Sequence, residues 1–88
     1  MIRRMPNRDG QRIVLYERAG CHLCEDAAVL LESMLGPDRY RRVDIDTDDD
    51  LLVRYGHRIP VVTVDGEERL EAPITAPDVR ALVARLSR

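Results

Sequence analysis

The 88-residue sequence predicts a single α/β domain with the element order βαβαββα. Three observations lead to this prediction. An apolar run at residues 12–16 is followed after a short turn by a helical pattern. A strand-like segment at residues 40–46 precedes a second, shorter helical pattern. The β-branched run at residues 61–64 is followed by Asp65-Gly66, a strong hairpin signal, and a last helical pattern follows the hairpin.

The first strand and helix are predicted as one unit. Successive apolar residues at 12–16 are typical of a central strand that is buried on both faces. A turn at residues 18–20 leads into a helix from His22, which Gly36-Pro37 ends. Apolar side chains three or four residues apart predict the buried stripe of this helix, namely Leu23, Ala27, Leu30, Leu31 and Met34.

The second strand, residues 40–46, alternates between polar and apolar side chains. Thr47 is the expected N-cap of the short helix that follows, and three aspartates at 48–50 suit the positive end of its dipole. We expect this triplet to serve the helix rather than a metal. Gly56 fits the C′ position, and the side chains expected to pack inward are Leu51, Leu52 and Tyr55.

The C-terminal part is predicted as a hairpin followed by a helix. Residues 67–71 are charged and read as an exposed edge strand. Residues 75–78 supply a capping residue, an early proline and an acid, the signature of a helix start. Its buried stripe is expected to be Val79, Leu82, Val83 and Leu86. The first two strands are joined through a helix, so we expect them to be parallel with a right-handed crossover.

Composition excludes several classes of partner. The 14 basic residues are all arginine, the net charge is −2, and the aromatic residues are three tyrosines, so neither a basic surface nor stacking platforms for nucleic acid are expected. No segment approaches the roughly 20 apolar residues of a membrane span. We expect residues 1–10 to be a flexible tail without the apolar core of a signal peptide, followed by one domain at 11–88. Without such a core, we expect the protein to stay in the cytoplasm. We also expect it to be a monomer.

Cys21 and Cys24 are the only cysteines and lie at the start of the first predicted helix. Structural disulfides are rare in the cytoplasm, so this pair indicates redox chemistry or metal binding. Disulfide exchange needs one thiolate to attack and a second thiol to resolve the mixed disulfide. Free backbone N–H groups at the helix start favour a thiolate at Cys21, and Cys24 lies nearly one turn later and less exposed. Cys21 is therefore predicted to attack and Cys24 to resolve.

Alternative interpretations of the cysteines remain open at this point. A structural zinc takes four ligands, and His22 lies between the cysteines, where it is poorly placed to complete a tetrahedron with them and His57. Metal shared between two chains is a further alternative. So is a non-catalytic module that binds a partner in the groove between Cys21 and Pro60. The cysteines could also be inert core residues.

Over residues 11–87 the chain resembles the glutaredoxin-like branch of the thioredoxin fold, especially small bacterial glutaredoxin-like proteins. Ordered motifs carry this resemblance: the Cys-x-x-Cys helix start, the strand that ends at residues 43–46, Tyr55-Gly56, the segment Ile59-Pro60-Val61-Val62 and the Asp65-Gly66 hairpin. It implies a thiol–disulfide oxidoreductase with a four-stranded mixed sheet flanked by helices. It also implies a cis Pro60 beside Cys21, with the Ile59 main chain pairing with an extended substrate.

The resemblance also suggests substrate-binding positions, with departures. Tyr16 and Arg18 fall where glutaredoxins carry Tyr and Lys. His22-Leu23 replaces the usual Pro-Tyr, and Arg58-Ile59 replaces Thr-Val before Pro60. Residues 70–73, Leu-Glu-Ala-Pro, replace a Gly-Gly pair that helps hold the carboxylate of glutathione. We therefore expect no bound cofactor or metal and no strict dependence on glutathione, which remains a possible reductant. The expected partner is a disulfide-containing protein or a low-molecular-weight thiol.

Overall fold

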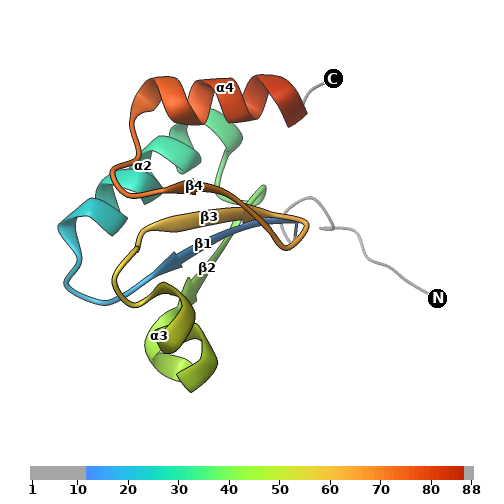
Figure 1. Ribbon diagram of the computed structural model, residues 1–88. Helices are drawn as coiled ribbons and strands as arrows, with labels where there is room; N and C mark the ends of the chain where they lie inside the picture. Colours follow the sequence, from blue (N-terminus) through green and yellow to red (C-terminus); the bar gives the residue numbers. More distant parts are fainter. Residues whose placement is uncertain (1–11, 87–88) are drawn as a thin grey trace.

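The computed structural model describes residues 12–86 (Figure 1). The chain runs in the predicted order of strands and helices. The strands are β1 (Ile13–Glu17), β2 (Arg41–Asp44), β3 (Val61–Val64) and β4 (Glu67–Glu71). The helices are α2 (His22–Leu35), α3 (Asp49–Tyr55) and α4 (Ala76–Leu86), with a 3-10 turn at Ile45–Thr47. The tail predicted for residues 1–10 lies outside the described residues.

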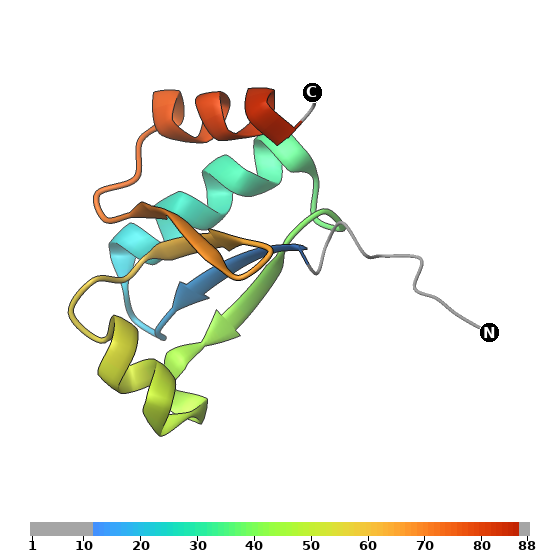
Figure 2. The same ribbon diagram turned by 45° about the vertical axis from the view of Figure 1, so that its right-hand side comes forward.

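The four strands form one mixed sheet in the order β2-β1-β3-β4. β1 pairs with β2 in parallel and with β3 antiparallel, and β3 pairs with β4 antiparallel. Helices α2 and α4 cover one face of this sheet and α3 covers the other (Figures 1 and 2). The predicted α/β fold with a flanked, four-stranded mixed sheet is confirmed.

Alternation along the central strands divides the core between the two faces. Successive side chains of a strand point to opposite faces. Val62 therefore packs under α2 and α4, while Val61 packs with Ile45 and Tyr55 under α3. The larger cluster holds most of the buried hydrophobic side chains in the described residues, among them Leu15, Leu31, Val64 and Val79. The strands at the centre of the sheet are buried on both faces, as the apolar runs predicted.

The first turn of α2 differs from the predicted buried stripe. Leu23 is 53% exposed, whereas Cys24 is fully buried. Both residues lie at helical spacing from Ala27 and Leu31, so periodicity alone fits either. The described packing buries Cys24 against the core and turns Leu23 outward, and the assignment of Leu23 to the buried stripe was wrong.

The start of α3 also differs from the prediction. Asp48, not Thr47, is the N-cap, and its carboxylate accepts the N–H groups of Asp50 and Leu51. Thr47 belongs to the preceding 3-10 turn, where its hydroxyl donates to the carbonyl oxygen of Asp44 at 2.7 Å. Gly56 ends the helix in a right-handed conformation rather than the left-handed one typical of a C′ glycine.

A β-bulge in β4 changes which side chains share a face. Val62 pairs with Leu70 and Thr63 pairs with Glu68, so Arg69 is an extra residue without a partner across the ladder. In a regular strand, residues three apart point to opposite faces. The bulge instead places Glu68 and Glu71 opposite Thr63 and Val61, two positions on the α3 face.

The start of α4 agrees with its prediction. Thr75 and Asp78 form a reciprocal cap: the N–H of Thr75 donates to the Asp78 carboxylate at 3.0 Å, and the N–H of Asp78 donates to the Thr75 hydroxyl at 3.3 Å. Val79 and Leu82 are buried against the sheet. Across residues 12–86, no helix combines the length and the apolar character needed to cross a bilayer.

Tyr40 should make stability fall at alkaline pH. Its buried hydroxyl donates to the carbonyl oxygen of Ala28, and burial raises the pKa of Tyr40 above its ordinary value. The folded state therefore holds this proton more tightly than the unfolded chain. The resulting stability is present below about pH 10 and is lost as pH rises toward the folded-state pKa.

The test is urea unfolding at pH 8 and pH 10.5 for wild type and Tyr40→Phe. We expect the free energy of unfolding of the wild type to fall more between these two pH values than that of the variant. At pH 8 the variant should lose about 0.5–1.5 kcal/mol with its hydrogen bond. Equal pH dependence in the two proteins would show that Tyr40 is not the group responsible.

Candidate active site

The two cysteines are joined by a disulfide at the start of α2, with Cα atoms 5.2 Å apart. Cys21 is the N-cap residue of the helix, and its sulfur accepts the backbone N–H of Cys24 at 3.1 Å. Cys21 is half-buried and Cys24 is fully buried. A substrate can therefore reach the sulfur of Cys21 more readily than that of Cys24. A backbone donor already points at the Cys21 sulfur, where it would stabilise negative charge.

The strand register brings Pro60 to the same end of the sheet as the dithiol. Tyr16 at the end of β1 pairs with Val61 at the start of β3, so the turn that leads to Cys21 and the segment that carries Pro60 lie side by side. The Ile59–Pro60 peptide bond is cis. Within residues 12–86, the main-chain N–H and carbonyl of Ile59 take part in no backbone hydrogen bond. These groups remain available to pair with an extended ligand.

Tyr16 lies on the opposite face of the sheet from α2. Its ring stacks on Tyr55, with centroids 4.7 Å apart, within the small cluster under α3. Its partly buried neighbours in that cluster include Ile59. The structure therefore connects Tyr16 to the Pro60 segment through packing. A direct contact of Tyr16 with substrate stays a prediction.

The other predicted contact residues surround the disulfide in different ways. His22 and Leu23 are exposed on the first turn of α2, directly between the two cysteines. Arg18 precedes the turn and forms an ion pair with Asp46 at 3.0 Å. Its carbonyl oxygen accepts the N–H of Cys21 at 3.4 Å. Arg18 therefore contributes its main chain to the dithiol turn while its side chain is paired elsewhere.

Arg58 connects the Pro60 segment to β4 through ion pairs. Its guanidinium forms ion pairs with both Glu68 and Glu71, and it lies 5.6 Å from the centroid of the Tyr55 ring. These two carboxylates raise the pKa of Arg58. The main chain adds a further link, because the carbonyl oxygen of Arg58 accepts the N–H of Ala72 at 3.4 Å. Arg58 is a brace for the segment, a role that the sequence analysis missed because the bulge that aligns Glu68 with Glu71 has no sequence signal.

Arg42 is a second residue that the sequence analysis missed. It donates two hydrogen bonds of 2.8 Å to Glu17 and one of 3.1 Å to Glu25. It thereby ties β2 to β1 and to the first turn of α2, and these carboxylates raise the pKa of Arg42. Glu25 lies in the first turn of α2, and its backbone N–H donates to the carbonyl oxygen of Cys21 at 3.1 Å, so its charge is close to the dithiol along the chain. Arg42 thus neutralises the charge of Glu25 near Cys21. The only sequence signal for this role was the position of Arg42 in a strand of alternating polar and apolar residues.

Replacing Arg42 should make Cys21 less reactive near neutral pH. Without Arg42, the charge on Glu25 is unopposed and disfavours a thiolate at Cys21. Charges near a helix end contribute about 0.3–1 kcal/mol, so the pH at which the thiol becomes reactive should rise by about 0.2–0.7 units in Arg42→Gln. The rate of alkylation of the reduced protein as a function of pH measures this shift. Arg41→Gln, with the same change of charge on the neighbouring residue, should shift it less, and equal shifts would contradict the role of Arg42.

The residues around the dithiol offer no recognisable metal site. Among residues 12–86, no group of three or more His, Cys, Asp and Glu is arranged to hold a metal ion. Both cysteine sulfurs are engaged in the disulfide. His22 and His57 are each exposed to solvent.

Comparison with solved structures places this geometry in a known class. The chain has the fold of glutaredoxin 2 from Chlamydomonas reinhardtii (19% identity, TM-score 0.56) over 88% of this chain and 75% of that one. It also has the fold of a thioredoxin mutant from Halobacterium salinarum (21% identity, TM-score 0.62) over 92% and 80%. The protein is thus of the thioredoxin fold, with its disulfide at the helix start.

The family model for the glutaredoxin-like domain (DUF836) matches residues 12–84, and the chain belongs to this family. The solved structure of the protein XcR50 from X. campestris is 36% identical, with a TM-score of 0.71, over 83% of this chain and 96% of that one. Protein Ne2328 from Nitrosomonas europaea is 26% identical, with a TM-score of 0.60, over 81% and 88%. A search of curated proteins gave no match. Family and paired cysteines together suggest a redox function.

Proposed function

We propose that this protein is a dithiol–disulfide oxidoreductase in which Cys21 attacks and Cys24 resolves. The observation that carries the proposal is the asymmetry of the pair. Cys21 is half-buried at the N-terminus of α2, while Cys24 is fully buried nearly one turn along the same helix. This arrangement suits an attacking thiol followed by an internal one.

The reaction balances as two successive exchanges. In the reduced protein, the Cys21 thiolate attacks one sulfur of a substrate disulfide, forms a mixed disulfide and releases the other substrate sulfur as a thiolate, which takes up a proton. The Cys24 thiol then loses its proton and attacks the Cys21 sulfur. The Cys21–Cys24 bond forms and the second substrate thiol leaves. Two electrons pass to the substrate, and a thiol reductant must return two electrons to the protein for another cycle.

The surroundings of the disulfide favour an extended polypeptide as substrate. The free main-chain groups of Ile59 can pair with an extended chain, and exposed Leu23 offers an apolar contact beside the cysteines. Glutathione has weaker support as an obligatory ligand. The guanidinium of Arg58, which could otherwise bind the carboxylate of glutathione, is already engaged by Glu68 and Glu71. Glutathione as the reductant, and a cytoplasmic site of action, stay predictions.

Catalysed reduction of a protein disulfide tests the proposal. With dithiothreitol as the reductant, wild type should accelerate the reduction of insulin disulfides well above the uncatalysed rate. Cys21→Ser should be no faster than buffer. Val29→Ala, which keeps both cysteines and changes an exposed residue of the same helix outside the site, serves as the matched control and should keep most of the activity. A wild-type rate equal to that of Cys21→Ser would remove the proposed function for protein disulfides.

A further inference from the structure

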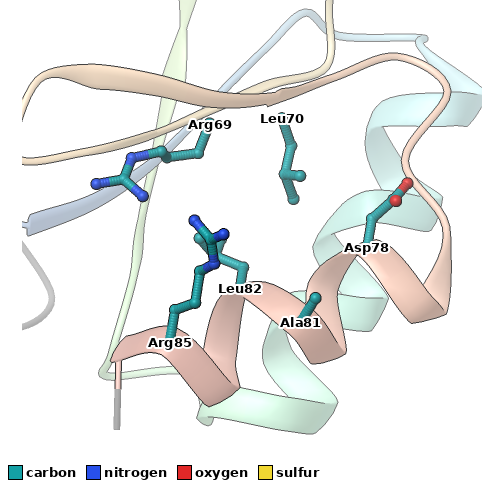
Figure 3. Close-up of a pocket in the computed structure, with 6 residues that line it drawn as sticks. All are labelled: Arg69, Leu70, Asp78, Ala81, Leu82 and Arg85. Carbon is teal, nitrogen blue, oxygen red and sulfur yellow. The ribbon is translucent and has the colours of Figure 1, made fainter. Parts of the chain in front are cut away.

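A cavity of about 240 Å³ lies between β4 and α4, away from the dithiol (Figure 3). Its six lining residues are Arg69, Leu70, Asp78, Ala81, Leu82 and Arg85. None of them belongs to the candidate active site. The volume is below the range of about 300–1,000 Å³ that drug-sized ligands occupy, so any occupant must be small.

The β-bulge places Arg69 in this cavity. Regular alternation would send Arg69 and Leu70 to opposite faces of the sheet. Because Arg69 is the extra residue of the bulge, both side chains line the cavity on the α4 side. Bulges commonly redirect side chains in this way. The backbone bulge therefore directs the Arg69 side chain, and with it a positive charge, toward the cavity.

Arg85 brings a second cation to the same place. Its guanidinium extends from α4 toward that of Arg69 in Figure 3. Among residues 12–86, Arg85 has no acidic partner, and Arg69 has only Glu67, an exposed residue 3.2 Å away. An exposed ion pair of this kind contributes little. Two guanidinium groups that line the same cavity, with one exposed counter-ion beside Arg69, form a site suited to an oxyanion, which they can bind through paired hydrogen bonds.

The rest of the cavity defines what the oxyanion must carry. Leu70, Ala81 and Leu82 provide apolar walls beside the two arginines. Asp78 closes the other end, seven residues or about 10 Å along the helix from Arg85, and would repel a second negative charge. One oxygen of its carboxylate already accepts the N–H of Thr75. The cavity is thus cationic at one end, apolar in the middle and anionic at the other end.

We propose that this cavity binds a small organic acid with one carboxylate on a short hydrocarbon body. The carboxylate lies between Arg69 and Arg85, and the hydrocarbon lies on Leu70 and Leu82. The far end of the ligand is uncharged, because Asp78 faces it. This site is independent of the dithiol and does not require the proposed oxidoreductase activity.

Titration of the ¹⁵N-labelled protein with simple acids tests the site. Pentanoate should give saturable shifts of the Arg69 and Arg85 side-chain Nε–H signals and of the Leu70 and Leu82 amides. Acetate, which lacks the hydrocarbon, and glutarate, which adds a second carboxylate, should each bind more weakly. Arg85→Gln should weaken pentanoate binding at least about tenfold, the effect of losing one charge-assisted hydrogen bond.

Arg80→Gln is the matched control. It removes the same charge from an exposed residue of the same helix that does not line the cavity, so it should leave binding unchanged. Arg69→Gln should repeat the effect of Arg85→Gln. The proposal is overturned if pentanoate produces no saturable shifts, if acetate binds as tightly as pentanoate, or if Arg80→Gln weakens binding as much as Arg85→Gln.

Discussion

A Cys24→Ser protein is expected to accumulate mixed disulfides on Cys21 that the wild type releases. Cys21 is the more exposed of the two cysteines and the proposed attacking thiol, so attack should still take place. The buried thiol that completes the exchange is missing, and the covalent intermediate persists. Turnover on protein disulfides should fall nearly to zero while the first exchange proceeds. Mass spectrometry of alkylated cell extracts under non-reducing conditions would detect the adducts and identify their other half.

The control for this experiment is Cys21→Ser, which should form almost no adducts because its remaining thiol is buried. Adducts of equal abundance in both variants would contradict the assignment of roles to the two cysteines. If glutathione were the only species trapped on Cys21, glutathione would be the substrate. The proposal of an extended polypeptide substrate, which rests on Ile59 and Leu23, would then be wrong.

Leu31→Ala is expected to cause a large loss of stability. Leu31 is fully buried on α2, the helix that carries both cysteines, in the cluster shared with Leu15, Val62 and Val79. Its truncation removes buried methyl groups and leaves a cavity that the strands beneath cannot fill. Such a change typically costs about 2–5 kcal/mol, a large share of the stability of a small domain. Urea unfolding monitored by circular dichroism measures it.

Val29→Ala on the same helix is the matched control. Val29 is 65% exposed, so its truncation should change the free energy of unfolding by no more than about 0.5 kcal/mol. If Leu31→Ala lost no more stability than Val29→Ala, the described packing of α2 on the sheet would be wrong.

The order of the elements could be predicted because local signals mark each of them. Apolar runs mark the strands that are buried on both faces, and Asp65-Gly66 marks the hairpin: Asp65 and Gly66 both adopt positive φ angles, as a tight hairpin turn requires. The start of α4 was also predictable, because Thr75 and Asp78 satisfy each other within one turn. These features depend on residues close together in the chain.

The features that the sequence did not reveal depend on tertiary packing. Leu23 and Cys24 both fit the helical period, and only the placement of α2 on the sheet decides which one is buried. Thr47 and Asp48 are both suitable N-cap residues, and the 3-10 turn that ends at Thr47 makes Asp48 the N-cap of α3. The bulge at Arg69 has no marker such as glycine, so neither the double ion pair of Arg58 nor the cavity beside α4 could be anticipated.

The reactive residues of the candidate site could be predicted from the sequence, but the ion pairs around them could not. Cys21, Cys24 and the Pro60 segment follow from motif and order, and the register between β1 and β3 brings them to one end of the sheet. The ion pairs of Arg42 and Arg18 with residues from other elements set the charge around that end. They join segments up to 28 residues apart in sequence, from Arg18 to Asp46, and no local pattern records such pairings.

A redox titration of the purified protein tests the central claim, that Cys21 and Cys24 form a reversible redox couple. The protein is equilibrated with mixtures of reduced and oxidised dithiothreitol, quenched with an alkylating reagent and weighed by mass spectrometry. We predict one reversible transition between a form with two alkylated cysteines and a form with none, approached equally from the oxidised and the reduced side. Thiols that remain alkylated at every mixture, or a disulfide that no mixture reduces in the folded protein, would contradict the claim.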